Sequence, residues 1–345
     1  MKLKWGIIGA GAIAEAFALA VSSSNTGELR SIGSRQLEKA QAFAAKFAIP
    51  VAFGNYKELI EDSQTDAVYV CTPHPMHAEW TIAAILAGKH VMCEKPLSMN
   101  YQEAVKMFEA ADKAKLMLME AFMYRCHPQT AKLVEILREN TIGDVRLIQA
   151  AFCFSAGFKP EGRLFNKRLG GGGILDVGCY PISLSRLIAG VAEGGNFVEP
   201  TEIKGVACIG QTGVDEWAAG ALKFESGIIA QVACGIRVGP ERSARIYGSN
   251  GSIFMPSPWV ASRKEPEQGR IILQINGKDS EEIIIQAAMT SFTYEIDAFG
   301  EAVFSGKLKP IFPAMSAEDS LGNMLALDSW RNEVGCAYEQ EKSCN

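Results

Sequence analysis

Residues 1–122 alternate between strand-like and helix-like segments, and this alternation constrains the fold more than any other feature of the sequence. The chain begins with an apolar segment, KWGIIG at 4–9, which is followed by an apolar-rich helical pattern at 12–21. Further predicted strands and helices continue the alternation: 29–35, 37–47, 66–73, 78–88 and 90–96. Strands that alternate with helices form a parallel sheet with helices on both faces. We therefore predict an α/β Rossmann domain with a doubly wound parallel sheet over residues 1–122.

The turn between the first strand and the first helix carries the pattern Gly-x-Gly-x-x-Ala. Gly9 permits a tight turn, and Gly11 lets a pyrophosphate approach the backbone. Ala14 occupies the third small-residue position, where helix and strand pack closely. Ala12 and Ile13 begin the helix, so their free N–H groups can bind phosphate. The pattern alone also fits an ordinary strand-to-helix turn, and its place in the alternating region is what favours a dinucleotide site.

The end of the second predicted strand indicates which dinucleotide is bound. An acidic residue there would hydrogen-bond the 2′-hydroxyl of NAD, but this chain has Ser34 and Arg35. A hydroxyl and a guanidinium can both bind a 2′-phosphate, and the guanidinium can also stack on adenine. We expect NADP(H) to be preferred over NAD(H). The alternative is that Arg35 is an ordinary solvated loop residue.

The alternation stops after about residue 120, and strand-like segments then follow one another. These segments are 144–154, 202–211, 218–224, 227–236, 243–249 and 270–275. Such a run of strands indicates an α+β domain, which we assign to residues 123–345. A helix is predicted at 316–334, where Ser316 and Asp319 form a capping-box pattern. This helix can pack back on the first domain.

Composition excludes several classes of function. The net charge is −5 with no Lys/Arg run, which argues against a nucleic-acid partner. Nine cysteines show no metal-ligand spacing, so we expect no metal site and reduced thiols in a cytoplasmic protein. The N-terminal segment could pass for a secretory signal, but Glu15 interrupts its apolar stretch. No other apolar run approaches the ~20 residues that span a bilayer, so no membrane partner is expected.

Four motifs, in this order, give the chain a resemblance to a known family. They are GIIGAGAIA at 6–14, CEKP at 93–96, YRCHP at 124–128 and GGGGILDVGCYP at 170–181. The sequence resembles the Gfo/Idh/MocA oxidoreductases over nearly its whole length, and within them the branch of dimeric dihydrodiol dehydrogenase and NADP-dependent D-xylose dehydrogenase. The resemblance implies that the second domain has an open, mostly antiparallel sheet. One face of that sheet would turn to the active site, and the other would form a homodimer.

The resemblance also points to three residues as a catalytic, proton-transferring set. Lys95 stands at the carboxyl end of a parallel strand, where ligands bind in open α/β sheets, and it is expected to hold or relay a proton. Asp176 and Tyr180 would lie on one face of a predicted helix, 175–188. Asp176 is expected to stay ionised and to orient a substrate hydroxyl or Lys95. The alternatives are a surface salt bridge for Lys95, a helix cap for Asp176 and core packing for Tyr180.

Tyr180 departs from the pattern of the family, because many members carry a histidine base at this place. A phenol has an unperturbed pKa of about 10, so it works near neutral pH only beside a cation, or as the acid in a reduction. The tyrosine matches the dihydrodiol and xylose dehydrogenase branch, and it puts an inositol dehydrogenase activity in doubt. The glycines at 170–173 would let their loop fold closely over the nicotinamide.

Further residues complete the predicted site. Besides those named above and Lys95, the cofactor contacts would be Thr72, Pro73, His77 and Glu94. His77 could instead only cap its helix.

The substrate contacts would be Lys95, Asp176 and Tyr180 together with Arg125 and Phe154. Arg125 belongs with His127 to the motif near the domain junction and could position either the substrate or the domains. Phe158 and Trp217 could add an aromatic wall, although aromatic residues in strands more often belong to the core.

These observations predict an NADP-dependent oxidoreductase that moves a hydride between the nicotinamide and a hydroxyl or carbonyl group of a sugar or cyclic polyol. Oxidation of an aldose at C1 is favoured, and oxidation of a trans-dihydrodiol or reduction of a keto-sugar is the alternative. A non-catalytic, NADP-binding regulatory module would be a different class of function. The joint presence of Lys95, Asp176 and Tyr180 argues against it, because a sensor needs no proton-transfer set.

Overall fold

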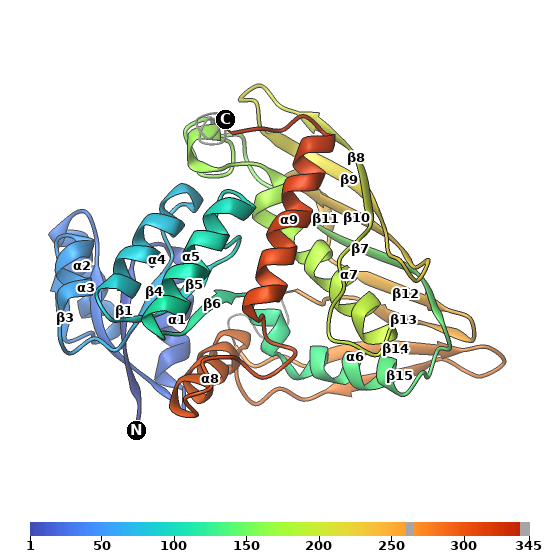
Figure 1. The fold of residues 1–345 in the computed structure, drawn as a ribbon, viewed down its shortest axis with the longest axis horizontal. Helices are drawn as coiled ribbons and strands as arrows, with labels where there is room; N and C mark the ends of the chain where they lie inside the picture. Colours follow the sequence, from blue (N-terminus) through green and yellow to red (C-terminus); the bar gives the residue numbers. More distant parts are fainter. Residues whose placement is uncertain (260–264, 339–345) are drawn as a thin grey trace.

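The computed structural model describes residues 1–259 and 265–338, which form two sheets with helices packed around and between them (Figure 1). The strands of the first sheet are β1 (Leu3–Ile8), β2 (Gly27–Gly33), β3 (Val51–Phe53), β4 (Ala67–Val70), β5 (His90–Glu94) and β6 (Leu118–Ala121). They are all parallel, in the order β3-β2-β1-β4-β5-β6. This is the doubly wound order of a dinucleotide-binding fold, so the predicted class is confirmed.

Helices cover both faces of the first sheet because its strands are apolar on both sides. These helices are α1 (Ala12–Ser22), α2 (Leu37–Phe47), α3 (Tyr56–Glu61), α4 (His77–Leu86) and α5 (Tyr101–Ala114). Within β1, Trp5 and Ile7 join one core cluster while Ile8 joins the other, as the alternation of side chains along a strand requires. Parallel sheets that are covered on both faces have strands of this continuously apolar kind.

The second sheet has nine strands, and all of its pairings are antiparallel except that of β7 with β10. Its strands are β7 (Val145–Ser155), β8 (Glu202–Ile209), β9 (Asp215–Lys223), β10 (Ile229–Gly235), β11 (Arg237–Glu241), β12 (Ala244–Gly248), β13 (Gly251–Met255), β14 (Gly269–Ile275) and β15 (Glu281–Ile285). The main path runs β15-β14-β13-β12-β7-β10-β9-β8, and β11 pairs with β7. The prediction of an open, mostly antiparallel sheet is confirmed.

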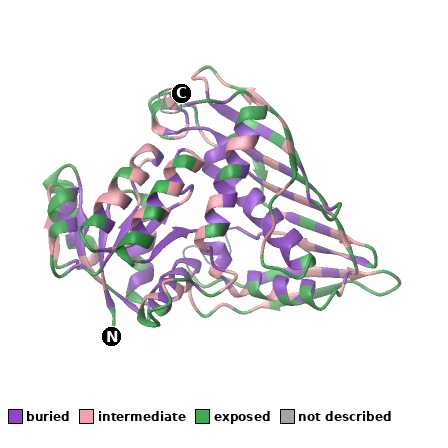
Figure 2. Cartoon of the chain, in the orientation of Figure 1, coloured by how far each residue is buried: buried purple, intermediate pink, exposed green. Residues whose placement is uncertain are grey.

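Helices α6 (Pro128–Arg138), α7 (Cys179–Ala192) and α9 (Ala317–Glu333) lie on the side of this sheet that faces the first sheet (Figure 1). Helix α7 is buried along almost its whole length (Figure 2). The helical stretch 167–192 is apolar and long enough to cross a membrane, with a mean hydropathy of 1.4, but it is buried inside the protein. We expected no apolar run of this length outside the N-terminal segment, and that expectation is wrong for 167–192.

The C-terminal helix α9 packs against both α5 and α7. The Tyr101 N–H at the start of α5 donates to Asp328 Oδ2 at 2.8 Å. At the other end of the helix, Ser316 Oγ accepts from the Asp319 N–H, as in a capping box. The Asp319 carboxylate does not complete the box, since it accepts hydrogen bonds from two arginines instead. Helix α8 (Ser291–Phe304) packs on α1.

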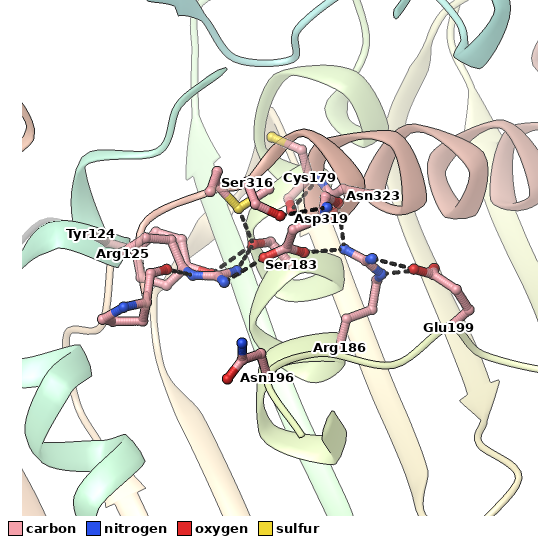
Figure 3. A network of polar contacts seen from close by, with 12 residues as sticks. Tyr124, Arg125, Cys179, Ser183, Arg186, Asn196, Glu199, Ser316, Asp319 and Asn323 are labelled. Carbon is pink, nitrogen blue, oxygen red and sulfur yellow. Dashed lines mark hydrogen bonds and ion pairs between the residues drawn. The ribbon is translucent and has the colours of Figure 1, made fainter. Parts of the chain in front are cut away.

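These two arginines form a buried ionic network with Asp319 beside α7 (Figure 3). Arg125, just after β6, lies 2.5 Å from Asp319 Oδ2, and Arg186 of α7 lies 2.6 Å from Oδ1. Both guanidinium groups are fully buried, and Glu199 pairs with Arg186 as well. Removing one partner of such a network leaves an uncompensated buried charge, which costs about 3–5 kcal/mol. The network therefore fixes α9 against both α7 and the segment that follows β6.

Candidate active site

Lys95 lies between the two sheets and contacts both other members of the predicted catalytic set. It follows β5 directly, at the carboxyl edge of the first sheet. Its Nζ donates a hydrogen bond to the Asp176 carbonyl oxygen at 2.7 Å and lies 3.9 Å from Asp176 Oδ1. The same Nζ lies 5.0 Å from the centroid of the Tyr180 ring. The three residues expected to act together thus converge on one point.

The backbone around Asp176 differs from the continuous helix expected over 175–188. Residues Ile174–Gly178 form a π-helical turn, and α7 begins only at Cys179. Asp176 therefore belongs to the wide turn and Tyr180 to the first turn of α7. Single π turns of this kind are frequent at functional sites. The spacing of apolar residues could not predict the turn, because it fits both helix types over so few residues.

Asp176 is a buried carboxylate held between two cations. Arg163 Nη1 donates to its Oδ1 at 2.6 Å, the same oxygen that lies 3.9 Å from Lys95 Nζ. Burial alone would raise the pKa of Asp176, but Lys95 and Arg163 outweigh it and lower that pKa to about 2. Asp176 is therefore ionised at neutral pH. Sequence reasoning missed Arg163, which lies in the segment between β7 and α7, where no motif or periodic pattern marks it.

His74 is a second neighbour of Asp176 that sequence reasoning missed. It begins the short 3-10 turn His74–Met76 after β4, and its Nδ1 lies 3.0 Å from the carbonyl oxygen of Gly170. Burial, reinforced by the neighbouring His77, lowers the pKa of His74 to about 3, so the imidazole is neutral. The available signal was its position at the carboxyl end of a parallel strand, where ligands bind.

An aromatic shell surrounds the ring of Tyr180. The centroids of four rings lie 5.1–5.8 Å from it: Phe122, Tyr124, Phe152 and Trp259. Tyr180 is only 5% exposed, so this packing fixes its ring. The predicted core packing and the predicted proton transfer are therefore compatible, because the same packing that buries the ring also orients the phenol.

The structure separates the aromatic residues that we expected to form a wall. Phe154 lies on the same face of β7 as Phe152 and packs against the core that contains Tyr180. Phe158 packs on Phe165 with a centroid distance of 5.1 Å. Trp217 is 43% exposed on the opposite face of the second sheet, so its predicted place in the wall is wrong.

Arg125 and His77 are both enclosed in the protein, which argues against a substrate contact for Arg125 and fits the alternative that it positions the domains. Arg125 is fully buried in the network with Asp319, so its guanidinium cannot contact a substrate without breaking those bonds. His77 is also fully buried, and its two ring nitrogens lie 2.9 Å from the carbonyl oxygens of Thr72 and Pro96. It braces the loops after β4 and β5. Neither burial could be inferred from the local sequence.

The Glu94 side chain also forms hydrogen bonds within the protein. One of its carboxylate oxygens accepts a hydrogen bond from the Tyr69 hydroxyl, and the other accepts from the Lys95 N–H at 3.2 Å. The side chain that we expected to contact the cofactor therefore fixes the backbone of Lys95.

The glycine-rich turn after β1 has the space that a pyrophosphate needs. Gly9 has φ +109°, and a Cβ there would lie 3.0 Å from the Cys71 carbonyl oxygen. A Cβ at Gly11 would meet nothing within 4 Å, so the backbone is open above the start of α1. Thr72 Oγ1 is buried with no hydrogen-bond partner among residues 1–259 and 265–338. It lies on the loop that precedes Pro73, at the same edge of the sheet, and these features fit a dinucleotide.

A hollow of about 620 Å³ lies further along the carboxyl edge of the first sheet and includes Arg35. Tyr56, Met76 and Trp80 also line it, which gives an aromatic surface beside the guanidinium. Ser34 is buried next to this hollow, whereas Arg35 is exposed. An adenine ring and a nearby phosphate could both be held here.

A doubly wound sheet with an open glycine turn, joined to a lysine, an aspartate and a tyrosine at its carboxyl edge, defines a dinucleotide-dependent oxidoreductase. Two family models match the chain. One describes an oxidoreductase family with an NAD-binding Rossmann fold, over residues 3–122, and the other the GFO/IDH/MocA C-terminal domain, over residues 130–254. The chain belongs to the Gfo/Idh/MocA family of oxidoreductases, as its motifs predicted.

Individual relatives agree with this family. Trans-1,2-dihydrobenzene-1,2-diol dehydrogenase of Mus musculus is 31% identical and aligns with 99% of this chain and 100% of its own. D-xylose 1-dehydrogenase (NADP(+)) 2 of Haloferax volcanii is 30% identical over 98% of this chain and 99% of its own. KijD10, a 3-ketoreductase from Actinomadura kijaniata solved with NADP and TDP-benzene, superposes with a TM-score of 0.85 at 28% identity, covering 97% of this chain and 98% of its own.

Proposed function

We propose that this enzyme uses NADP(H) to oxidise the C1 hydroxyl of an aldose, or to reduce the corresponding carbonyl. The observation that carries the proposal is the position of Lys95, which contacts Asp176 and lies over the ring of Tyr180. The chain thus has a cation, an ionised carboxylate and a phenol at the edge of the sheet where a nicotinamide would bind. Two relatives that act on a sugar and on a cyclic diol support this class of substrate.

The residues that would hold the cofactor fall into two groups. Gly9, Gly11 and the start of α1 would bind the pyrophosphate, while Ser34 and Arg35 would bind the 2′-phosphate of NADP. When bound, the nicotinamide supplies the hydride acceptor or donor. The NADP in the KijD10 structure and in the name of the xylose dehydrogenase supports this choice of cofactor.

The side chains of this chain would move the proton. The Lys95 ammonium lies 5.0 Å from the centroid of the Tyr180 ring, so a cation stands beside the phenol that would exchange the proton. Tyr180 can then take the proton from the substrate hydroxyl during oxidation, or return it during reduction. Asp176 remains ionised, so it accepts a hydrogen bond from a substrate hydroxyl and holds Lys95 and Arg163 in place.

Two other substrate classes and one other class of function remain alternatives. A trans-dihydrodiol would be oxidised, and a keto-sugar would be reduced, by the same three residues. The names of the Mus musculus dehydrogenase and of KijD10 support one alternative each. A regulatory module that only binds NADP would have no need for the convergence of Lys95, Asp176 and Tyr180.

A substrate screen tests the proposed function. Aldoses, trans-dihydrodiols and keto-sugars are offered to the purified protein with NADP⁺ or NADPH, and the absorbance of NADPH is followed. We expect the highest kcat/KM with an aldose and NADP⁺. A higher kcat/KM for a dihydrodiol or a keto-sugar would show that this alternative, and not an aldose, is the substrate class. NADP(H) binding without turnover of any of the three classes would instead support the regulatory module.

We also propose a homodimer formed through the outer face of the second sheet. A broad hollow of about 820 Å³ crosses this face, and small residues such as Ala219, Ala221 and Ala233 line it together with polar residues such as Lys204, Glu241 and Arg245. Val206 is 73% exposed and Trp217 43% exposed on the same face. An isologous contact with a second copy would remove this apolar surface from water.

A further inference from the structure

The glycine run at 170–173 closes on a buried carboxylate that neither the motif nor the mechanism above includes. Asp215 begins β9, is fully buried, and accepts a hydrogen bond from the Ile174 N–H at 2.6 Å through Oδ2. A Cβ on Gly172 would lie 2.3 Å from Asp215 Oδ1, and the φ of Gly172 is +121°. Only glycine satisfies both conditions. We expected these glycines to let their loop approach the nicotinamide. In the structure, the missing side chain of Gly172 makes room for Asp215.

The segment after α9 holds the same turn from its other side. The Tyr338 hydroxyl donates to the Gly171 carbonyl oxygen at 2.5 Å, and Cys336 Sγ donates to Asp215 Oδ1 at 3.5 Å. Tyr338 is fully buried and Cys336 is 3% exposed. Side chains from β9 and from the segment after α9 therefore fix two backbone groups of the turn, the Gly171 carbonyl and the Ile174 N–H.

The charge of Asp215 suits this role. Burial raises the pKa of Asp215 to about 6, against the opposing effect of the N–H group of Ile174. The carboxylate is therefore mostly ionised at neutral pH. An ionised acceptor makes stronger hydrogen bonds to N–H groups than a neutral one, and the partial positive charge at the start of a helix adds to this.

We propose that Asp215 is a positioning residue for the active site: by fixing the turn at Gly172–Ile174, it places Asp176 and Tyr180 against Lys95. Asp176 is only two residues beyond the N–H group that Asp215 binds. The inference rests on the proposed function in one respect, since that function assigns proton transfer to Asp176 and Tyr180. A misplacement of about 1 Å in such a cluster costs on the order of 100-fold in rate.

The chain offers a matched control for a merely structural effect. Asp297 of α8 is also a buried carboxylate, and it accepts from the N–H groups of Asn25 and Thr26 at 3.0 and 3.1 Å. It braces the loop between α1 and β2, which includes no residue of the predicted site. Asp297→Ala therefore removes the same kind of contact without touching the turn at Gly172–Ile174.

The experiment compares Asp215→Ala, Asp215→Asn and Asp297→Ala in melting temperature, kcat and KM for NADP⁺. We expect Asp215→Ala to lower kcat about 10- to 100-fold while KM for NADP⁺ changes less than about threefold. Asp215→Asn keeps a carbonyl acceptor for the Ile174 N–H and should recover most of kcat. Asp297→Ala should have a lower melting temperature but an unchanged kcat. An unchanged kcat in Asp215→Ala, or an equal loss in Asp297→Ala, would overturn the inference.

Crystal structures decide the inference even if the proposed function fails. We expect Asp176 to lie away from Lys95 in Asp215→Ala and in its original place in Asp215→Asn. An unmoved Asp176 in Asp215→Ala would refute the positioning role, whatever the wild type catalyses. If Asp215→Ala does not fold, Asp215→Ser takes its place, because it also removes the carboxylate but leaves a small polar side chain at the buried position. Its kcat should fall as in Asp215→Ala, and an unchanged kcat with an unmoved Asp176 would overturn the inference.

Discussion

The Lys95 ammonium lies 5.0 Å from the centre of the Tyr180 ring, and the same group donates a hydrogen bond to the backbone of Asp176. Lys95 thus contacts both Tyr180, whose phenol can exchange a proton, and the turn that carries the ionised carboxylate of Asp176. The pairing connects the two halves of the chain, since Lys95 follows β5 of the first sheet while Tyr180 lies in α7, which packs on the second.

This pairing predicts that Tyr180 and Lys95 act as one unit. Tyr180→Phe should preserve the aromatic packing and NADP binding but lower kcat by about 10²–10⁴-fold, because a general acid/base is lost. Lys95→Met should remove most turnover as well. The double variant should be little worse than the poorer single variant, since members of one unit are not additive. Steady-state kinetics with NADPH absorbance measures all three. If Tyr180→Phe raises only KM, the tyrosine binds substrate and does not transfer the proton.

Arg35 should determine the preference for NADP. Its replacement by alanine removes a charge-assisted contact with the 2′-phosphate and should weaken NADP binding by about 1–3 kcal/mol, with little effect on NAD. Isothermal titration with each cofactor measures the difference. Lys57 lies in the lining of the same hollow, so Lys57→Ala is a control for a general loss of positive charge there. Equal affinities of the unmodified enzyme for NAD and NADP would rule out the predicted preference.

Arg163 should affect substrate binding more than the chemical step. It pairs with Asp176 at 2.6 Å while its side chain is 49% exposed, so Arg163→Gln should leave Asp176 less well oriented toward the substrate. We expect KM for the substrate to rise about tenfold, which corresponds to about 1.4 kcal/mol. Lys159→Gln, at an exposed position in the same segment, is the control. A fall in kcat at constant KM would show that Arg163 acts in the transition state.

Glu120 should make stability depend on pH. Burial, with a further contribution from Asp319, raises the pKa of Glu120 from 4.5 to about 8 in the folded protein. The folded protein then keeps a proton that the unfolded chain releases near pH 4.5, so this contribution to stability is lost as the pH rises to about 8. Glu120→Gln removes the titration and keeps an acceptor for the Leu97 N–H. Its stability relative to wild type should increase by about 1–3 kcal/mol between pH 5 and 8, as thermal unfolding can measure.

The outer face of the second sheet should hold two copies together. Sedimentation should give a mass of about twice the 37.3 kDa of one chain, and Ala219→Glu should give monomers because it places a large charged side chain among the small residues that the second copy would cover. Leu86→Glu places the same charge at an exposed apolar residue of α4, away from this face, and should leave the mass unchanged. A concentration-independent mass near 37.3 kDa for the unmodified protein would refute the dimer.

The elements that the sequence predicted well are those whose apolar pattern extends over many residues. The alternation in residues 1–122 gave the parallel sheet, and long apolar runs such as 227–236 gave the central strands of the second sheet. By contrast, β11 has the sequence RVGPE, which carries no alternation, and it becomes a strand only through its pairing with β7. The π turn at Ile174–Gly178 was missed because local periodicity cannot distinguish it from an α-helical turn.

The active site likewise contains residues that the sequence pattern could predict and residues that only the tertiary structure reveals. The motifs predicted Lys95, Asp176 and Tyr180, and the structure brings the three together. Arg163 could not be predicted because no motif marks its segment, and Asp215 could not because it follows Ile174 by 41 residues and only tertiary structure places it beside the turn. The predicted substrate contact of Arg125 and the predicted cofactor contact of His77 conflict with the burial of both side chains, and burial is a property of the whole fold that the local sequence does not show.

The contact between Tyr338 and Gly171 also bears on the order in which a newly made chain can become active. During synthesis the N-terminal sheet is complete long before the residues after α9 leave the ribosome, and domains generally fold in that order. The turn that carries Asp176 gains the hydrogen bond from Tyr338 to Gly171 only after Tyr338 has been synthesised and packed. Cofactor binding can thus arise on a nascent chain well before the final placement of the groups that we expect to move the proton.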